Sequence, residues 1–128
     1  ERRMASELLR SVPVLQISNV ERSCEFYCGK LGFKKNWQHQ FEPGLPRFVS
    51  ISRGAVTLFL TEHPESASGA LVYLYVEDVD ALARELQSHG AIIDQGPTSQ
   101  PWGMREIQLH DPDGNRLRLG QDIEEKKS

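Results

Sequence analysis

The chain of 128 residues is the size of one domain or of two small fused modules, which excludes a TIM barrel or a full dinucleotide-binding dehydrogenase. Hydrophobic residues make up 38% and charged residues 26%, as is typical of a globular chain and not of a disordered one. The formal net charge of −3 lacks the basic excess of a nucleic-acid-binding protein, and no apolar run approaches the roughly 20 residues that span a bilayer. We therefore expect neither nucleic acid nor a membrane as a partner.

The first half of the chain predicts a strand, a helix and three further strands. Apolar and polar residues alternate over 12–18, and Asn19 then stands where a helix N-cap is expected. Apolar side chains follow at helical spacing as far as Gly32, a residue type that commonly ends helices. Further strands are expected at 33–38, 47–52 and 56–61.

The same pattern restarts after a polar segment that is rich in structure-breaking residues. Asp78 occupies the N-cap position that Asn19 holds in the first half, and Gly90 ends the second helix. We expect strands at 71–76, 91–94, 105–110 and 116–120, with a hairpin turn at 111–115. The chain therefore divides into an N-terminal segment (1–11), a first βαβββ module (12–62), a linker (63–69), a second βαβββ module (70–120) and a C-terminal tail (121–128).

The repeat predicts an α+β fold in which two tandem βαβββ modules form a cupped mixed sheet. In each module the helix covers one face of the sheet and leaves the other face bare. The bare faces form a hollow suited to a small ligand, and a second copy of the chain would cover them best. We therefore expect a small-molecule ligand and a homodimer.

The cysteines and histidines predict no metal or redox site. Cys24 and Cys28 lie one helical turn apart, a spacing that does not readily close a disulfide, so we expect both to be small, buried hydrophobic residues. None of the four histidines has the spacing of a metal-ligand pair, and no nucleophile elbow or phosphate-binding glycine loop is present. Because no apolar signal segment is visible, the cytoplasm is the expected location.

Three stretches carry a resemblance to a known superfamily. They are residues 15–33, the V-E-D-V-D-A of 76–81 and the D-P-D-G-N-R-L of 111–117. Together they resemble the vicinal oxygen chelate superfamily, which includes glyoxalase I, extradiol dioxygenases and bleomycin-resistance proteins. The Q-P-W-G-M-R-E of 100–106 is most similar to the bleomycin-resistance branch. That resemblance implies the glyoxalase/bleomycin-resistance-like fold and a metal-free dimer that binds an antibiotic such as bleomycin.

The resemblance also provides a test for a metal. Enzymes of the superfamily hold a divalent ion at four strand positions, which align here with Val12, Leu58, Leu71 and Arg118. Of the four alignments, the one at Leu58 has the widest margin, about one residue along the strand. Valine and leucine carry no donor atom and a guanidinium does not bind a metal, so we expect no metal, no cofactor and no catalytic residue. Whether the chain is an enzyme stays open, with a non-catalytic role favoured.

Aromatic, guanidinium and carboxylate side chains on inward strands and loops are the candidate ligand-binding residues. Aromatic rings would stack on a planar ligand, although core packing is the alternative for Phe48 and Phe59. If Arg118 points into the cleft, its charge needs a partner, either Glu106 or an anionic ligand. The candidates are Trp37, Phe41, Phe48, Phe59, Trp102, Arg105, Glu106 and Arg118.

Three hypotheses of function follow. The first is a metal-free small-molecule-binding protein that sequesters an antibiotic or metabolite in a cleft. The second is a metal-dependent enzyme of the glyoxalase or dioxygenase type with displaced ligands. The third is a structural or regulatory partner domain without a ligand. The missing donor atoms favour the first over the second, and Trp102 in its glycine-containing loop favours the first over the third.

Overall fold

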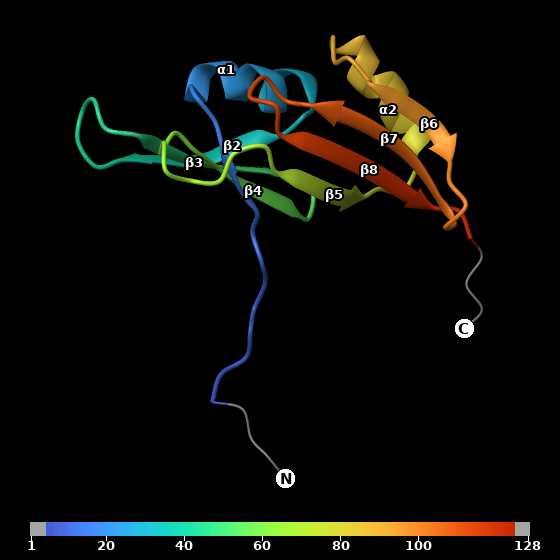
Figure 1. Ribbon diagram of the computed structural model, residues 1–128, viewed down its shortest axis with the longest axis horizontal. Helices are drawn as coiled ribbons and strands as arrows, with labels where there is room; N and C mark the ends of the chain where they lie inside the picture. Colours follow the sequence, from blue (N-terminus) through green and yellow to red (C-terminus); the bar gives the residue numbers. More distant parts are fainter. Residues whose placement is uncertain (1–4, 125–128) are drawn as a thin grey trace.

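Figure 1 shows the protein as a computed structural model, which describes residues 5–124. The first four residues of the predicted N-terminal segment and the last four of the predicted tail lie outside the described residues. No helix within 5–124 is long and apolar enough to cross a membrane.

The first module forms a four-stranded mixed sheet with one helical segment. Strand β1 pairs in parallel with β4, and the strand order is β1-β4-β3-β2. The helix predicted as one piece begins as an α-helix and continues as a wider π-helical turn, closed by the Leu31 N–H donating to the Phe26 carbonyl. The elements are β1 (Val14–Gln16), α1 (Val20–Cys24), η1 (Glu25–Lys30), β2 (Lys34–Gln40), β3 (Arg47–Arg53) and β4 (Val56–Thr61).

The second module repeats this topology in a separate sheet. Its strand order is β5-β8-β7-β6, again with the first strand parallel to the last. This repetition confirms the predicted α+β fold with two tandem modules. The elements are β5 (Leu71–Tyr75), α2 (Val79–Ser88), β6 (Gln95–Ser99), β7 (Met104–His110) and β8 (Arg116–Asp122).

Two predicted boundaries in the second module are wrong. Residues 91–94 are not a strand, because the Ala91 N–H still bonds the Leu86 carbonyl at the helix end. Pairing with β7 begins only where the Asp94 N–H donates to the Gln108 carbonyl. Strand β6 follows at the edge of the sheet, and an irregularity in its register accommodates Pro97. At the other end β8 runs on to Asp122, so the predicted tail starts inside the sheet.

Each helix begins with the same hydrogen-bonding arrangement. Asn19 and Asp78 act as the predicted N-caps, accepting from the N–H groups of Arg22 and Ala81 at 2.9 and 3.0 Å. A side chain at or just after the end of the module's last strand accepts the first N–H of the helix. Glu62 accepts from Val20, and Gln121 accepts from Val79, both at 2.9 Å.

The two sheets share one hydrophobic core on their helix-covered faces. Alternate residues of the strands point toward the helices, as Leu58, Leu60, Ile107 and Leu109 do, and are fully buried. Both helices lie on the same side of the sheets, in the upper part of Figure 1, so the opposite faces carry no helix. These open faces are where the remaining alternate residues of each strand are found.

Candidate ligand-binding site

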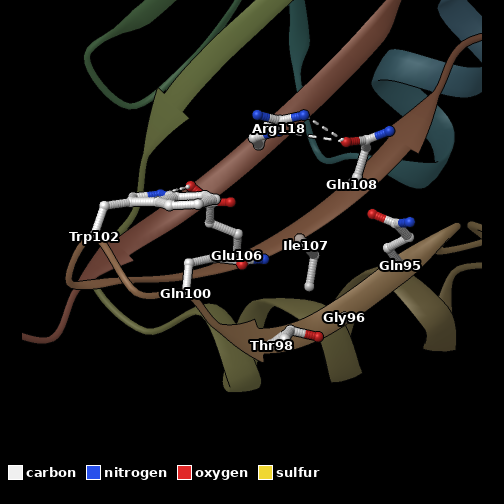
Figure 2. A pocket seen from close by; sticks show the side chains of 9 residues that line it. All are labelled: Gln95, Gly96, Thr98, Gln100, Trp102, Glu106, Ile107, Gln108 and Arg118. Atoms are coloured by element: carbon white, nitrogen blue, oxygen red, sulfur yellow. Dashed lines mark hydrogen bonds between the residues drawn. The ribbon is translucent and has the colours of Figure 1, made fainter.

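A pocket of about 500 Å³ lies on the open face of the second sheet. Strands β6, β7 and β8 form its floor, and the loop that carries Trp102 forms one wall (Figure 2). The residues that line it are Gln95, Gly96, Thr98, Gln100, Trp102, Glu106, Ile107, Gln108 and Arg118. Six of the nine lining residues have polar or charged side chains, whereas the opposite face of the same strands carries core leucines and isoleucine.

The strand register explains which polar side chains meet in the pocket. Gln108 lies opposite Arg118, and Glu106 lies opposite Gly120, on the antiparallel pair β7 and β8. Thr98 of β6 pairs with Glu106 on its other side. Residues directly opposite one another on neighbouring strands share a face of the sheet, so this register gathers their side chains on the open side.

Glu106 is the centre of the hydrogen-bond network in the pocket. Glu106 is only 5% exposed, and its Oε2 atom accepts hydrogen bonds from Tyr73 Oη at 2.6 Å and from Trp102 Nε1 at 3.1 Å. Burial, together with the Glu106 carboxylate, raises the pKa of Tyr73 well above its usual range. The tyrosine therefore stays protonated and holds the carboxylate as a hydrogen-bond donor.

The absence of a side chain at Gly120 makes room for this network. Tyr73 reaches Glu106 from β5 by lying across β8, and a Cβ atom at position 120 would overlap Tyr73 Oη. Any larger residue would push the tyrosine away from the carboxylate. The glycine is thus required by a close approach and not by an unusual backbone conformation.

Arg118 points into the pocket, where its hydrogen-bond partner is Gln108 and not Glu106, one of the two partners considered from the sequence. Its Nε and Nη2 atoms donate to Gln108 Oε1 at 3.3 and 3.0 Å, as the dashed lines of Figure 2 show. A neutral amide therefore holds the guanidinium, and its positive charge is not cancelled by a direct ion pair with a described residue. Opposite charges on Glu106 and Arg118 both remain available to a ligand.

The structure divides the predicted aromatic residues between two places. Trp102 lines the pocket and is 59% exposed. Trp37, Phe48 and Phe59 form a separate cluster on the first sheet, with ring centroids 5.2 to 5.9 Å apart. Phe41 belongs to neither group, because it follows β2 in an exposed turn. These four residues do not line the pocket of the second sheet.

Arg105 does not reach the pocket either, because it points to the helix-covered face. Its Nε and Nη2 atoms donate to the Asp80 carboxylate at 2.8 and 3.0 Å, and the Arg105 hydrogen bond lowers the pKa of Asp80. Arg47 makes the equivalent contact with Glu21 in the first module. Because successive strand residues face opposite sides, Arg105 and Glu106 cannot both point into one pocket. That alternation was readable in the sequence.

Several lining residues, and Tyr73, which bonds Glu106 without lining the pocket itself, were not among the candidates predicted from the sequence. Tyr73 and Gln108 share the open face with Glu106 and Arg118, and strand alternation would have placed them there. Gln95 and Thr98 of β6 also line the pocket. They were not candidates because the strand was predicted at 91–94. The missed residues are Tyr73, Gln95, Thr98, Gln100 and Gln108.

The positions aligned with the superfamily metal site do not fit a metal. Leu58 is fully buried in the core and does not face the open side. In the first module Val14 pairs with Phe59, and in the second Tyr73 pairs with Arg118, so Phe59 is the residue equivalent to Arg118. With this correction the four positions hold Val12, Phe59, Leu71 and Arg118, none of which has a metal-binding atom. Within 5–124 no group of three or more His, Cys, Asp or Glu side chains could hold an ion.

Comparison with known proteins identifies the family. A family model described as glyoxalase superfamily protein matches residues 4–126, almost the whole chain. The chain belongs to the glyoxalase superfamily. This result confirms the resemblance stated from the sequence motifs.

The chain is also similar to a relative in sequence and to several solved structures. An uncharacterized protein of Mycolicibacterium smegmatis is 34% identical over 107 residues, which cover 81% of this chain and 85% of the relative. TnmS3, an antibiotic binding protein from Streptomyces sp. CB03234, is 28% identical with a TM-score of 0.73, covering 94% of this chain and 99% of that one. A bleomycin-binding protein solved in complex with bleomycin is 26% identical with a TM-score of 0.72, covering 89% and 98%.

Proposed function

We propose that this glyoxalase-superfamily protein binds and sequesters a small molecule, an antibiotic or a metabolite, without a metal. The observation that carries the proposal is the pocket of the second sheet, where the exposed Trp102 ring lies beside a buried carboxylate. An aromatic wall with a few convergent polar groups is typical of small-molecule sites. The side chains at the superfamily metal positions offer no donor for metal-dependent chemistry.

The similar structures support the antibiotic as a class of ligand. TnmS3 is an antibiotic binding protein, and the bleomycin-binding protein holds bleomycin. Both align with about nine-tenths or more of this chain, so the likeness includes both modules. A planar ring system stacked on Trp102 would gain about 0.5–1.5 kcal/mol beyond the area that it buries.

We also propose that the protein is a cytoplasmic homodimer in which a second copy covers the open faces. The aromatic cluster of the first sheet leaves Trp37 48% exposed, and Val14, Leu71 and Tyr75 are exposed on the same open side. A surface of this kind on a small domain favours an interaction partner. A second copy whose first sheet faced the pocket would add an aromatic wall to its polar floor. Light scattering tests this proposal, and a monomeric mass at micromolar concentration would contradict it.

The binding proposal is tested by isothermal titration calorimetry on chelator-treated protein. The compounds titrated are metal-free bleomycin and a panel of planar aromatic antibiotics and metabolites. We expect at least one compound to bind, and Trp102→Ala to weaken that binding by about tenfold or more because the stacking surface is lost. Ile92→Ala is the matched control, since Ile92 is an exposed apolar residue that does not line the pocket. Unchanged affinity in a folded Trp102→Ala protein would contradict the assignment of the site.

A further inference from the structure

Two opposite charges lie in the pocket without forming a pair. Glu106 and Arg118 line the same cavity, yet each is held by neutral groups, Tyr73 and Trp102 for the carboxylate and Gln108 for the guanidinium. They are diagonal neighbours on β7 and β8, because Gly120 and Gln108 are their direct partners. The other lining side chains are uncharged, so the formal charge of the pocket is zero.

On the acidic side, one carboxylate oxygen is free. Both hydrogen bonds to Glu106 end on Oε2, and Oε1 accepts none from the described residues. No fully buried polar side-chain atom within 5–124 lacks a partner, so Oε1 is open to the pocket. A carboxylate oxygen of this kind accepts hydrogen bonds and cannot donate them.

On the basic side, two donors are free. Arg118 uses Nε and Nη2 for Gln108, and the amide of Gln108 uses only its oxygen. Arg118 Nη1 and Gln108 Nε2 therefore donate to no described residue, and by the same argument they reach the pocket. Figure 2 shows these two side chains on one side of the pocket, with Trp102 and Glu106 on another.

We infer that this pocket recognises a neutral planar group with a donor–acceptor edge, such as a primary carboxamide on an aromatic ring. Its N–H would donate to Glu106 Oε1, its carbonyl would accept from Arg118 or Gln108, and its ring would lie on Trp102. A cationic head group is attracted by Glu106 but repelled by Arg118. An anionic head group is attracted by Arg118 but repelled by Glu106. The inference deepens the proposed function and rests on it.

Three small probes of nearly the same shape test this inference on the full chain. Benzamide, benzamidine and benzoate share a ring and a planar head group but are neutral, cationic and anionic at pH 7. Binding is followed by the ¹H–¹⁵N resonance of the Trp102 indole, whose N–H bonds Glu106. Trp102→Phe assigns that resonance against the second tryptophan, Trp37.

We expect benzamide to bind the natural protein about tenfold more tightly than either charged probe. Arg118→Met should make benzamidine the preferred probe, and Glu106→Gln should make benzoate preferred, because each variant leaves a single charge in the pocket. Arg116→Gln is the matched control, since Arg116 lies on the same strand but does not line the pocket. Its order of preference should match that of the natural protein.

Preference of the natural protein for benzamidine or benzoate would overturn the inference, as would an order unchanged by both variants. Failure of all three probes up to their solubility limits would also overturn it. If Glu106→Gln does not fold, Arg118→Met alone decides, because Arg118 is partly exposed. The titrations with bleomycin and larger compounds test the proposed function separately, so a protein that binds them but shows no benzamide preference would lose only this inference.

Discussion

Tyr27 of the first module donates a hydrogen bond of 2.8 Å to Asp111 Oδ2 of the second, and both side chains are almost completely buried. The carboxylate accepts three more bonds, from the N–H groups of Asp113 and Asn115 and from Asn115 Nδ2. Asn115 also donates to the Gln16 carbonyl of β1. The hairpin turn of 111–115 therefore joins the two modules.

Asp113 makes a second set of contacts from the same turn. Its Oδ1 accepts from the Ser18 hydroxyl at 2.6 Å and from Arg22 Nη2 at 2.7 Å, beside the start of α1. The D-P-D-G-N motif that carried the superfamily resemblance is thus a structural connection between modules. The residues of this motif do not line the pocket.

The first prediction concerns this connection. Tyr27→Phe removes one hydrogen bond to a buried carboxylate and should lower the free energy of unfolding by about 2 kcal/mol. Urea unfolding followed by circular dichroism measures the change. Tyr75→Phe serves as the control, because Tyr75 is largely exposed and its hydroxyl bonds no described residue. Equal stability of the Tyr27→Phe protein and the natural protein would show that the connection contributes nothing.

The second prediction is a pH dependence of that contribution. Burial first, and then the charge of Asp111, raise the pKa of Tyr27 well above its usual range. An unfolded tyrosine ionises near pH 10, so above this pH the unfolded state binds fewer protons and stability falls as pH rises. The stability advantage over Tyr27→Phe should be complete at neutral pH and shrink between about pH 9 and about pH 11. A difference in unfolding free energy between the two proteins that stays constant across this pH range would contradict the raised pKa of Tyr27 as the cause.

The third prediction concerns Gly120 in the pocket. Gly120→Ala should displace Tyr73 from Glu106, because the new Cβ would occupy the place of the tyrosine hydroxyl. We expect the Trp102 indole resonance to shift and benzamide binding to weaken about as much as in Tyr73→Phe. Gly29→Ala is the control, since a Cβ there meets no atom within 4 Å. A Gly120→Ala spectrum identical to that of the natural protein would mean that Tyr73 does not position the carboxylate.

The fourth prediction separates the two arginines that were both candidate ligand-binding residues. Arg105→Met should leave the affinity for any compound found in the titrations unchanged and only slightly lower the thermal stability, because it removes a surface contact with Asp80. Arg118→Met should change the affinity or the probe preference. Loss of ligand binding in a folded Arg105→Met protein would contradict this prediction, because it would show that a residue on the helix-covered face contributes to the affinity of the pocket.

Much of the fold could be predicted from the sequence, because both modules carry the same local signals. The N-caps Asn19 and Asp78 and the helix-ending glycines Gly32 and Gly90 mark equivalent points, and the structure places them as predicted. Local signals did not locate β6, whose pairing depends on Gln108 of a neighbouring strand and whose Pro97 weakens the strand pattern. Long-range pairing of this kind is not visible in a short window of sequence.

The site was predictable only in part, for a similar reason. Trp102, Glu106 and Arg118 were among the candidates predicted from the sequence, and they line the pocket. Arg105 does not line the pocket, because it is adjacent to Glu106 and adjacent residues of a strand face opposite sides of the sheet. Tyr73 was missed because it reaches Glu106 across β8, and only the empty position at Gly120 allows that contact.

The proposed binding without a metal is tested most directly by metal content. Protein purified without chelator is dialysed against Zn²⁺, Ni²⁺, Mn²⁺ and Fe²⁺ in turn, and the metal retained per chain is measured by elemental analysis. We predict no stoichiometric retention of any of the four, with ligand binding unchanged by chelator. One ion retained per chain would contradict the placement of Val12, Phe59, Leu71 and Arg118 at the superfamily metal positions.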